Sequence, residues 1–183
     1  MFINTKSLFL GIVGIILLSL GVGMFVGSYY NISLLNLNPI APVYNFPTES
    51  TEISSIKLLE LINKERALKD LPPFEENNTL SYIAYLRATD ILENQEFSHE
   101  ATRSGLKYNT IAKKVGYPYK EIKENLALGF NSEEEIIDAW KKSKKHAENL
   151  FAAGNYNVGM YSKKGIFNGK DKIVTVLILG IEN

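Results

Sequence analysis

Apolar residues form one long, unbroken run near the N-terminus and periodic patterns after it. From residue 8 to residue 26 every side chain is apolar or glycine except Ser19. At about 1.5 Å rise per residue, such a run spans the ~30 Å hydrocarbon thickness of a bilayer. We therefore predict one transmembrane helix over residues 8–28, serving as a membrane anchor or an uncleaved signal.

The charges around this run set its expected orientation. Lys6 is the only charged residue before Glu49. Because cytoplasmic flanks carry the excess of Lys and Arg, we expect residues 1–7 in the cytoplasm and the bulk of the chain outside the cell. Residues 29–51 contain three prolines, which suits an extended tether. The expected location is the cell membrane with a single pass, and small residues at 26–28 leave open cleavage and secretion.

Beyond the tether, residues 52–183 show helical periodicity in their first part, where apolar side chains recur every three to four positions. The pattern predicts four helices, over residues 53–69, 80–92, 111–115 and from 132 to about 145. Ser132 followed by three glutamates is a capping-box signature for the start of the last of these.

The C-terminal part of the chain has strand character instead. Tyr156–Ser162 is rich in strand-forming residues, and Ile173–Leu179 is a continuous β-rich run of the kind buried on both faces of a sheet. Asn168-Gly169 marks a turn between them. Helices first and strands last predict an α+β fold in which a small antiparallel sheet is covered by helices.

Composition excludes several classes of function. The chain has no cysteine, so disulfides, thiolate nucleophiles and cysteine-based zinc sites are absent. Any metal must be bound by histidine, carboxylate or carbonyl groups. Lys plus Arg and Asp plus Glu each number 20, and this lack of basic excess disfavours nucleic acid as a partner.

The candidate chemistry rests on two histidines. His99 and His146 are the only ones in the chain, and neither lies in a short local metal motif such as HExxH. Four lysines between residues 141 and 145 precede His146. They complement the dipole at the end of the predicted helix, and the alternative is a basic patch for anionic lipid or wall polymer.

Several short motifs occur in a fixed order along residues 52–183. They are Asn63 with Arg66, Leu80 with Ala84 and Arg87-Ala88, Phe97-Ser98-His99, Glu124-Asn125-Leu126-Ala127, and Trp140 with Ser143, His146 and Asn149. Together they resemble the CAP superfamily, also called the SCP domain, in the form found in exported bacterial proteins. The resemblance implies an α-β-α sandwich with a surface cleft.

The resemblance also implies a site at that cleft. His99 and His146 match the two histidines of the family, and Glu124 matches the acid of its Glu-Asn-Leu-Ala motif. Many animal members carry a second Glu three residues after the helix Trp, where this chain has Ser143. Two neutral imidazoles and one carboxylate are a three-ligand set for Zn²⁺ or a similar divalent ion. The same groups can instead hold one another by hydrogen bonds.

Three functions are therefore open. The first is a membrane-anchored, extracytoplasmic CAP domain whose cleft, with His99, Glu124, His146 and Asn125, binds a metal, a lipid-like molecule or a cell-envelope component. The second is a hydrolase of envelope peptide or lipid, using either a metal or Ser143 as nucleophile, with His99, Glu124 and His146 as catalytic candidates. The third is a structural or adhesive module. For Asn125 we also expect backbone hydrogen bonds that fix the loop carrying Glu124.

Overall fold

The computed structural model describes residues 43–48 and 51–183. The predicted anchor over residues 8–28 and most of the tether lie outside the described residues. Within those residues, we find no helix with the length and apolar character that a membrane span requires.

Four strands form one mixed sheet in the order β1-β3-β4-β2. Their bounds are β1 Glu75–Glu76, β2 Tyr119–Leu128, β3 Asn157–Phe167 and β4 Lys170–Glu182. β3 and β4 form a hairpin, β2 pairs antiparallel with β4, and the two-residue β1 pairs parallel with β3. We expected an antiparallel sheet, and this expectation is wrong in one respect. The sheet is mixed, because β1, which follows α2, runs parallel to β3.

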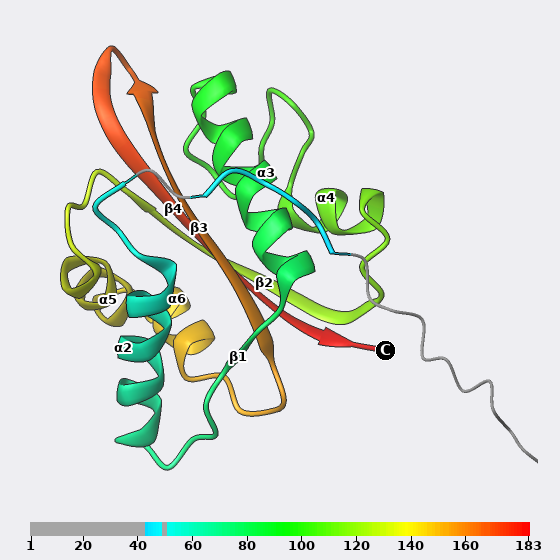
Figure 1. Cartoon of the computed structure of the whole chain (residues 1–183), viewed down its shortest axis with the longest axis vertical. Coiled ribbons are helices and arrows are strands. Elements are labelled where there is room, and N and C mark those ends of the chain that lie inside the picture. The colour runs from blue at the N-terminus through cyan, green and yellow to red at the C-terminus, as the bar shows by residue number, and fades with distance from the viewer. Residues whose placement is uncertain (1–42, 49–50) are drawn as a thin grey trace, which may run out of the picture. The chain divides into compact units, whose positions relative to one another are not determined.

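Five helices pack on this sheet in the described part of the chain (Figure 1). Their bounds are α2 Ser55–Ala67, α3 Asn78–Asn94, α4 Tyr108–Lys114, α5 Glu133–Lys142 and α6 Lys144–Leu150. Side chains of β4 alternate between two buried clusters, with Leu177 in one and Ile178 in the other. This alternation is the period of two of a strand covered on both faces. The fold is α+β, with helical layers on the sheet as expected.

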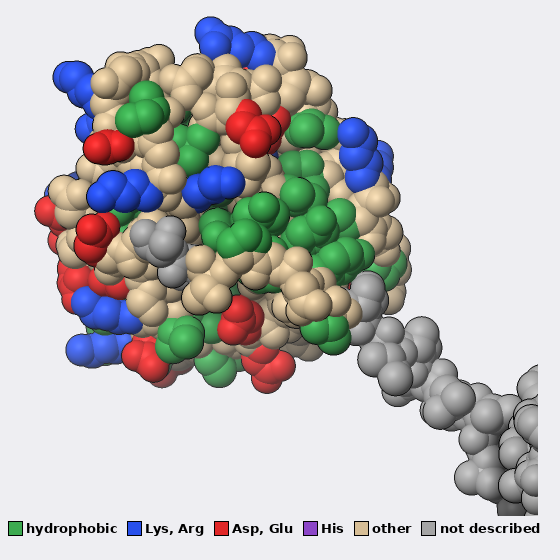
Figure 2. Space-filling model, turned by 45° about the horizontal axis from the view of Figure 1, so that its top comes forward, with side chains coloured by type: hydrophobic (Ala, Val, Ile, Leu, Met, Phe, Trp, Pro, Cys, Tyr) green, Lys and Arg blue, Asp and Glu red, His purple; other side chains and the backbone are tan. Residues whose placement is uncertain are grey.

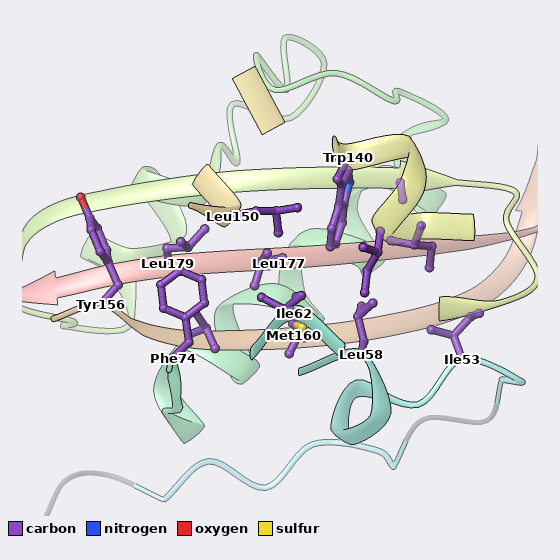
Figure 3. Close-up of a cluster of buried hydrophobic side chains, with 14 of the residues drawn as sticks. Ile53, Leu58, Ile62, Phe74, Trp140, Leu150, Tyr156, Met160, Leu177 and Leu179 are labelled. Carbon is purple, nitrogen blue, oxygen red and sulfur yellow. The ribbon is translucent and has the colours of Figure 1, made fainter. Parts of the chain in front are cut away.

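Each face of the sheet has its own core. Residues of α2, α5 and α6 pack on one face around Trp140, which is 1% exposed and donates its indole N–H to the carbonyl of Leu126 over 3.0 Å. Figure 3 shows this cluster, with Trp140 and Leu150 in the upper part of the view and Phe74 and Leu58 below them. Residues of α3 and α4 pack on the other face. Gly159 permits the close approach of α3, because a Cβ there would lie 2.0 Å from the backbone of Leu80.

Local capping signals decide where the helices begin. Ser132 accepts a hydrogen bond from the backbone N–H of Glu135, as the capping-box pattern predicts. The cap of α3 is Asn77, and its side chain accepts a hydrogen bond from the backbone N–H of Leu80. The helix therefore begins at Asn78, two residues before the predicted range of 80–92.

Two expectations for the second half of the chain are wrong. Residues 119–128 form β2, so Glu124 lies on a strand and not in a loop. The helix predicted from residue 132 to about 145 is two helices, which are separated at Ser143 because its backbone is extended, with ψ 117°. Ser143 thus ends α5, and His146 belongs to the separate helix α6.

Candidate functional site

The structure brings His99, Glu124 and His146 together from three elements. His99 follows α3 in a loop, Glu124 lies in the middle of β2, and His146 is on α6. Nδ1 of His99 lies 2.7 Å from Oε2 of Glu124. The two imidazole ring centroids are 5.9 Å apart, with 60° between the ring planes.

The position of β2 explains why histidines from opposite helical layers meet. β2 is the edge strand of the sheet, so groups from both faces reach around it. Successive side chains of a strand point to opposite faces. Glu124 pairs in register with Ile178 and faces α3, whereas Asn125 pairs with Leu177 and faces α6. The dipeptide Glu124-Asn125 therefore links the two layers.

A buried ion network holds the carboxylate of Glu124. The side chains of Glu124 and Arg87 are both 0% exposed, and Nε of Arg87 donates to Oε1 of Glu124 over 3.0 Å. Nη1 of Arg87 also pairs with Asp90 at 2.8 Å, and Nη2 donates to the carbonyl of Ser98. A buried charge persists only with partners of this kind, because desolvation otherwise costs several kcal/mol. Both oxygens of Glu124 are thus engaged, one by Arg87 and one by His99.

The same carboxylate orients His99. A carboxylate facing Nδ1 favours the tautomer that carries the proton there, because Nδ1–H then donates to Oε2. Nε2 keeps its lone pair in that tautomer. The ring of His99 is half exposed, at 48% of its side-chain surface, so Nε2 is free to accept a hydrogen bond or to ligate an ion.

A carboxylate also closes the loop that carries His99. Glu96 accepts hydrogen bonds from the backbone N–H and hydroxyl of Thr102 and from the backbone N–H of Arg103, at 2.7 to 2.8 Å. Hydrogen bonds from Arg103 and then Thr102 lower the pKa of Glu96. Ala101 within this loop adopts the left-handed region at φ 45°, and His99 is presented two residues before it.

Asn125 and Asn149 position His146. Nδ2 of Asn125 donates to the carbonyl of His146 over 3.1 Å, and Nδ2 of Asn149 donates to Oδ1 of Asn125 over 2.8 Å. Asn149 also donates to the carbonyl of Glu124, which satisfies the outer edge of β2. Asn125 is fully buried, so it supports the helix that carries His146. Asn125 thus makes a hydrogen bond to the backbone, as expected. Its partner is on α6 and not in the loop that we expected to carry Glu124.

The environment favours neutral imidazole at His146. Burial lowers the pKa of His146, and the neighbouring His99 lowers it further. Both causes act against the charged form, the first through desolvation and the second through repulsion between two imidazolium ions. His146 therefore presents a nitrogen lone pair at neutral pH.

The side chains of His99, Glu124 and His146 line a surface cavity of about 540 Å³, whereas the buried Asn125 does not. Eleven of the described residues form its wall, and none of these eleven has an aliphatic side chain. Among them, Tyr108 at the start of α4 contributes the one aromatic ring besides the histidines. Lysines and acids surround the imidazoles in equal number, including Lys107, Lys145 and Glu148. The cavity is suited to a ligand with hydrogen-bonding groups.

Other predicted or missed residues lie as follows. Ser143 does not line the cavity, and its side chain makes no capping hydrogen bond to α6. Arg87 and Asp90 were missed as parts of the site, although Arg87 occupies a core position on the apolar stripe of α3, and a charged residue there signals a buried partner.

A divalent ion would find a reduced set of ligands here. Within the described residues there is no group of three or more His, Cys, Asp or Glu side chains arranged to hold a metal ion. With Glu124 engaged by Arg87 and His99, the imidazoles of His99 and His146 are the ligands left, one fewer than catalytic zinc sites use. Their separation suits a shared ion, because two imidazoles bound at ~2.1 Å have centroids roughly 5–6 Å apart.

Comparison with known sequences identifies relatives. The family model described as CAP, cysteine-rich secretory protein family, matches residues 59–178. Uncharacterized protein YkwD of Bacillus subtilis (strain 168) is 31% identical over 104 residues, which cover 57% of this chain. The same alignment covers 40% of YkwD, so the chain spans well under half of that relative.

Solved structures share the fold. An outer surface protein from Borrelia burgdorferi superposes with a TM-score of 0.62 at 23% identity, over 70% of this chain and 92% of that one. An extracellular protein containing a SCP domain from Bacillus anthracis str. Ames gives 0.54 at 19% identity, over 67% and 39%. A cysteine-rich secretory protein from Staphylococcus aureus gives 0.54 at 24% identity, over 75% and 41%. The match of the family model to residues 59–178 shows that this chain, although it has no cysteine, belongs to the CAP family of cysteine-rich secretory proteins.

Proposed function

We propose that this CAP domain is an extracytoplasmic binding module whose cavity takes a polar ligand of the cell envelope. The observation that carries the proposal is the pair of imidazoles at the cavity wall, with centroids 5.9 Å apart and one ring held by the buried Glu124. A buried ion network and a chain of asparagine hydrogen bonds hold these two groups beside the surface cavity. These contacts fix the positions of the two imidazoles. A surface histidine with no binding role does not need such support.

The polarity of the cavity wall distinguishes between the candidate ligands. An acyl chain needs an apolar lining, and no described residue in the wall of this cavity has an aliphatic side chain. Sugars and peptides instead offer hydroxyl, amide and carboxylate groups, which match lysine, glutamate, asparagine and imidazole. Soluble wall fragments built from sugar and peptide are therefore better candidates than lipids.

Membrane anchoring is the other part of the proposal. It rests on the apolar run from residue 8 to residue 26 and on Lys6 before it. Two of the solved relatives are described as an outer surface protein and an extracellular protein, which agrees with a domain outside the cytoplasm. External protease added to intact cells should degrade the domain. Survival of the domain until the cells are lysed would contradict this orientation.

A divalent ion is the second candidate ligand, favoured by the separation of the two imidazole rings. Bound zinc would supply a Lewis acid beside the cavity. We expect Zn²⁺ to raise the melting temperature of the full-length chain at pH 7.5 and to lose this effect in mild acid, where imidazole is protonated. His99→Ala or His146→Ala should each abolish the shift. Ser143→Ala should retain it, and equal loss in all three variants would contradict ligation by the histidines.

The binding proposal is tested by calorimetry of the full-length chain with disaccharide-peptide fragments of bacterial peptidoglycan. Binding that is saturable and at least tenfold weaker in His99→Ala and His146→Ala supports it. Lys170→Ala is the matched control, because Lys170 is exposed at the start of β4 and does not line the cavity. Absence of binding at millimolar fragment, or the same affinity in all variants, would overturn the proposal.

A further inference from the structure

Residues 43–48 lie across α3 as an extended segment, far in sequence from the helix that they contact (Figure 1). Tyr44 and Phe46 are two residues apart, so in an extended chain both rings point to the same side. The ring of Tyr44 stacks on Tyr82 with centroids 4.3 Å apart and 9° between the planes. Phe46 contacts Tyr82 and Tyr85 at 6.0 and 5.8 Å.

Polar groups of the folded domain bind the backbone of this segment. Asn78 accepts a hydrogen bond from the N–H of Tyr44 over 2.8 Å and donates to the carbonyl of the same residue over 3.4 Å. The hydroxyl of Tyr161, on β3, donates to the carbonyl of Pro47 over 3.0 Å. An amide that pairs with both backbone groups of one residue recognises an extended peptide as a neighbouring strand would.

The phenol of Tyr44 makes a further contact, at the C-terminal end of α4. Its hydroxyl donates to the carbonyl of Val115, the residue that ends α4, over 2.8 Å. Because that carbonyl lies at a helix C-terminus, it has no partner within the helix and is available to a donor. A phenylalanine at position 44 could stack but could not make this bond.

The receptor surface is built from regular elements of the domain. Tyr82 and Tyr85 are three residues apart on α3 and share one face of that helix, and Tyr161 meets Tyr85 edge to face at 5.1 Å. Lys163 borders the surface, with its Nζ 5.3 Å from the Tyr85 ring. Figure 2 looks onto a face where hydrophobic side chains gather in one continuous area bordered by lysine or arginine. Neither histidine is visible on that face, and none of these residues lines the histidine cavity.

We propose that Asn78, Tyr82, Tyr85 and Tyr161 form a peptide-binding groove for an extended aromatic-x-aromatic-Pro segment, and that Tyr44–Pro47 of the same chain occupies it. Rings give the affinity and the Asn78 amide fixes the register of the bound segment. The groove is a second binding surface, separate from the histidine cavity and independent of the proposed ligand.

Occupancy in cis follows from the covalent connection. A segment joined to its site by a short chain acts at an effective concentration in the millimolar range. A free peptide at micromolar concentration therefore cannot displace it. The groove becomes available only when the two rings of the segment are removed.

The test vacates the groove and supplies the segment as a separate molecule. The full-length chain carries Tyr44→Ala and Phe46→Ala together, and the probe is a fluorescent peptide with the sequence of residues 42–50. We expect saturable anisotropy with the double variant, at least tenfold tighter than with the unsubstituted chain. Asn78→Ala added to the double variant should weaken binding at least fivefold. The same affinity for the unsubstituted chain and the double variant would overturn the proposal. Absence of binding to a double variant whose circular dichroism spectrum is unchanged would also overturn it.

A second measurement needs no vacated groove, so it stands if the double variant does not fold. Chymotrypsin should cleave after Tyr44 slowly in the unsubstituted chain and at least fivefold faster in Asn78→Ala. The matched control is Asn131→Ala, at an exposed asparagine before α5, with an unchanged rate. Equal rates in the three proteins would overturn the proposal. A rate that falls with protein concentration would also overturn it, because the segment would then occupy the groove of a second copy.

Discussion

Removal of Arg87 is the sharpest perturbation of the buried network beneath His99. Arg87→Met keeps the apolar stem of the side chain and removes the guanidinium. That group pairs with Asp90 at 2.8 Å and Glu124 at 3.0 Å, and all three side chains are at most 4% exposed. The substitution leaves two buried carboxylates without a cation. Breaking a buried pair in this way costs about 3–5 kcal/mol.

Arg66→Met is the matched control, because Arg66 is equally buried but binds no carboxylate of the described residues. Its guanidinium donates to the carbonyls of Pro72, Leu150 and Ala152 and lies over the ring of Phe74. Losing it leaves polar carbonyls unpaired, at about 1–3 kcal/mol. We therefore expect Arg66→Met to destabilise the domain less than Arg87→Met does.

Urea denaturation of both variants at pH 7 compares the two costs. We expect the free energy of unfolding to fall by about 3–5 kcal/mol in Arg87→Met and by less in Arg66→Met. A loss below ~1.5 kcal/mol for Arg87→Met, or a loss in Arg66→Met as large as that in Arg87→Met, would refute the network as described.

Three further outcomes follow from the structure. Gly159→Ala should lower the free energy of unfolding by about 1–3 kcal/mol in a urea titration, because its Cβ would overlap the backbone of α3. NMR titration should place the pKa of His146 below the usual histidine value, and His99→Ala should raise it by removing the neighbouring charge. The stability linked to His146 is present above ~pH 6.5 and is lost as pH falls through its lowered pKa. Glu96→Gln should lower the hydrogen-exchange protection factors of the loop amides that Glu96 binds at least tenfold, and acid should lower these protection factors in the parent once the pH falls through the lowered pKa of Glu96.

Local signals were sufficient to predict most of the helices. The apolar spacing of α2 and α3 and the Ser132 cap of α5 depend on residues within a few positions of one another, and the structure places helices there. The β3–β4 hairpin was likewise predicted from its apolar runs and its Asn168-Gly169 turn. In these segments the residues that decide the structure are neighbours in the sequence.

Elements decided by distant partners were missed. β2 contains Lys123-Glu124-Asn125 at its centre, and these three polar residues interrupt the apolar pattern that marks a strand. The partners of Glu124 and Asn125 lie far away in sequence, Arg87 on α3 and Asn149 on α6. The break between α5 and α6 at Ser143 was also missed. Lysines on both sides of Ser143 continue a helical pattern, so the neighbouring residues do not signal the break. The meeting of the two histidines was predicted from the order of the family motifs, since their spacing alone carries no such information.

The proposed binding function requires that His99 and His146 present free imidazole nitrogens to a ligand of the cavity. Long-range ¹H–¹⁵N correlation spectra of the full-length chain observe these nitrogens directly, because the chain has only two histidines. We predict that His99 carries its proton on Nδ1 at neutral pH, and that peptidoglycan disaccharide-peptides shift the Nε2 resonance of His99 and a ring nitrogen of His146 together, with one saturation curve. A neutral His99 with its proton on Nε2, or imidazole resonances that do not move at millimolar fragment, would contradict the proposed function.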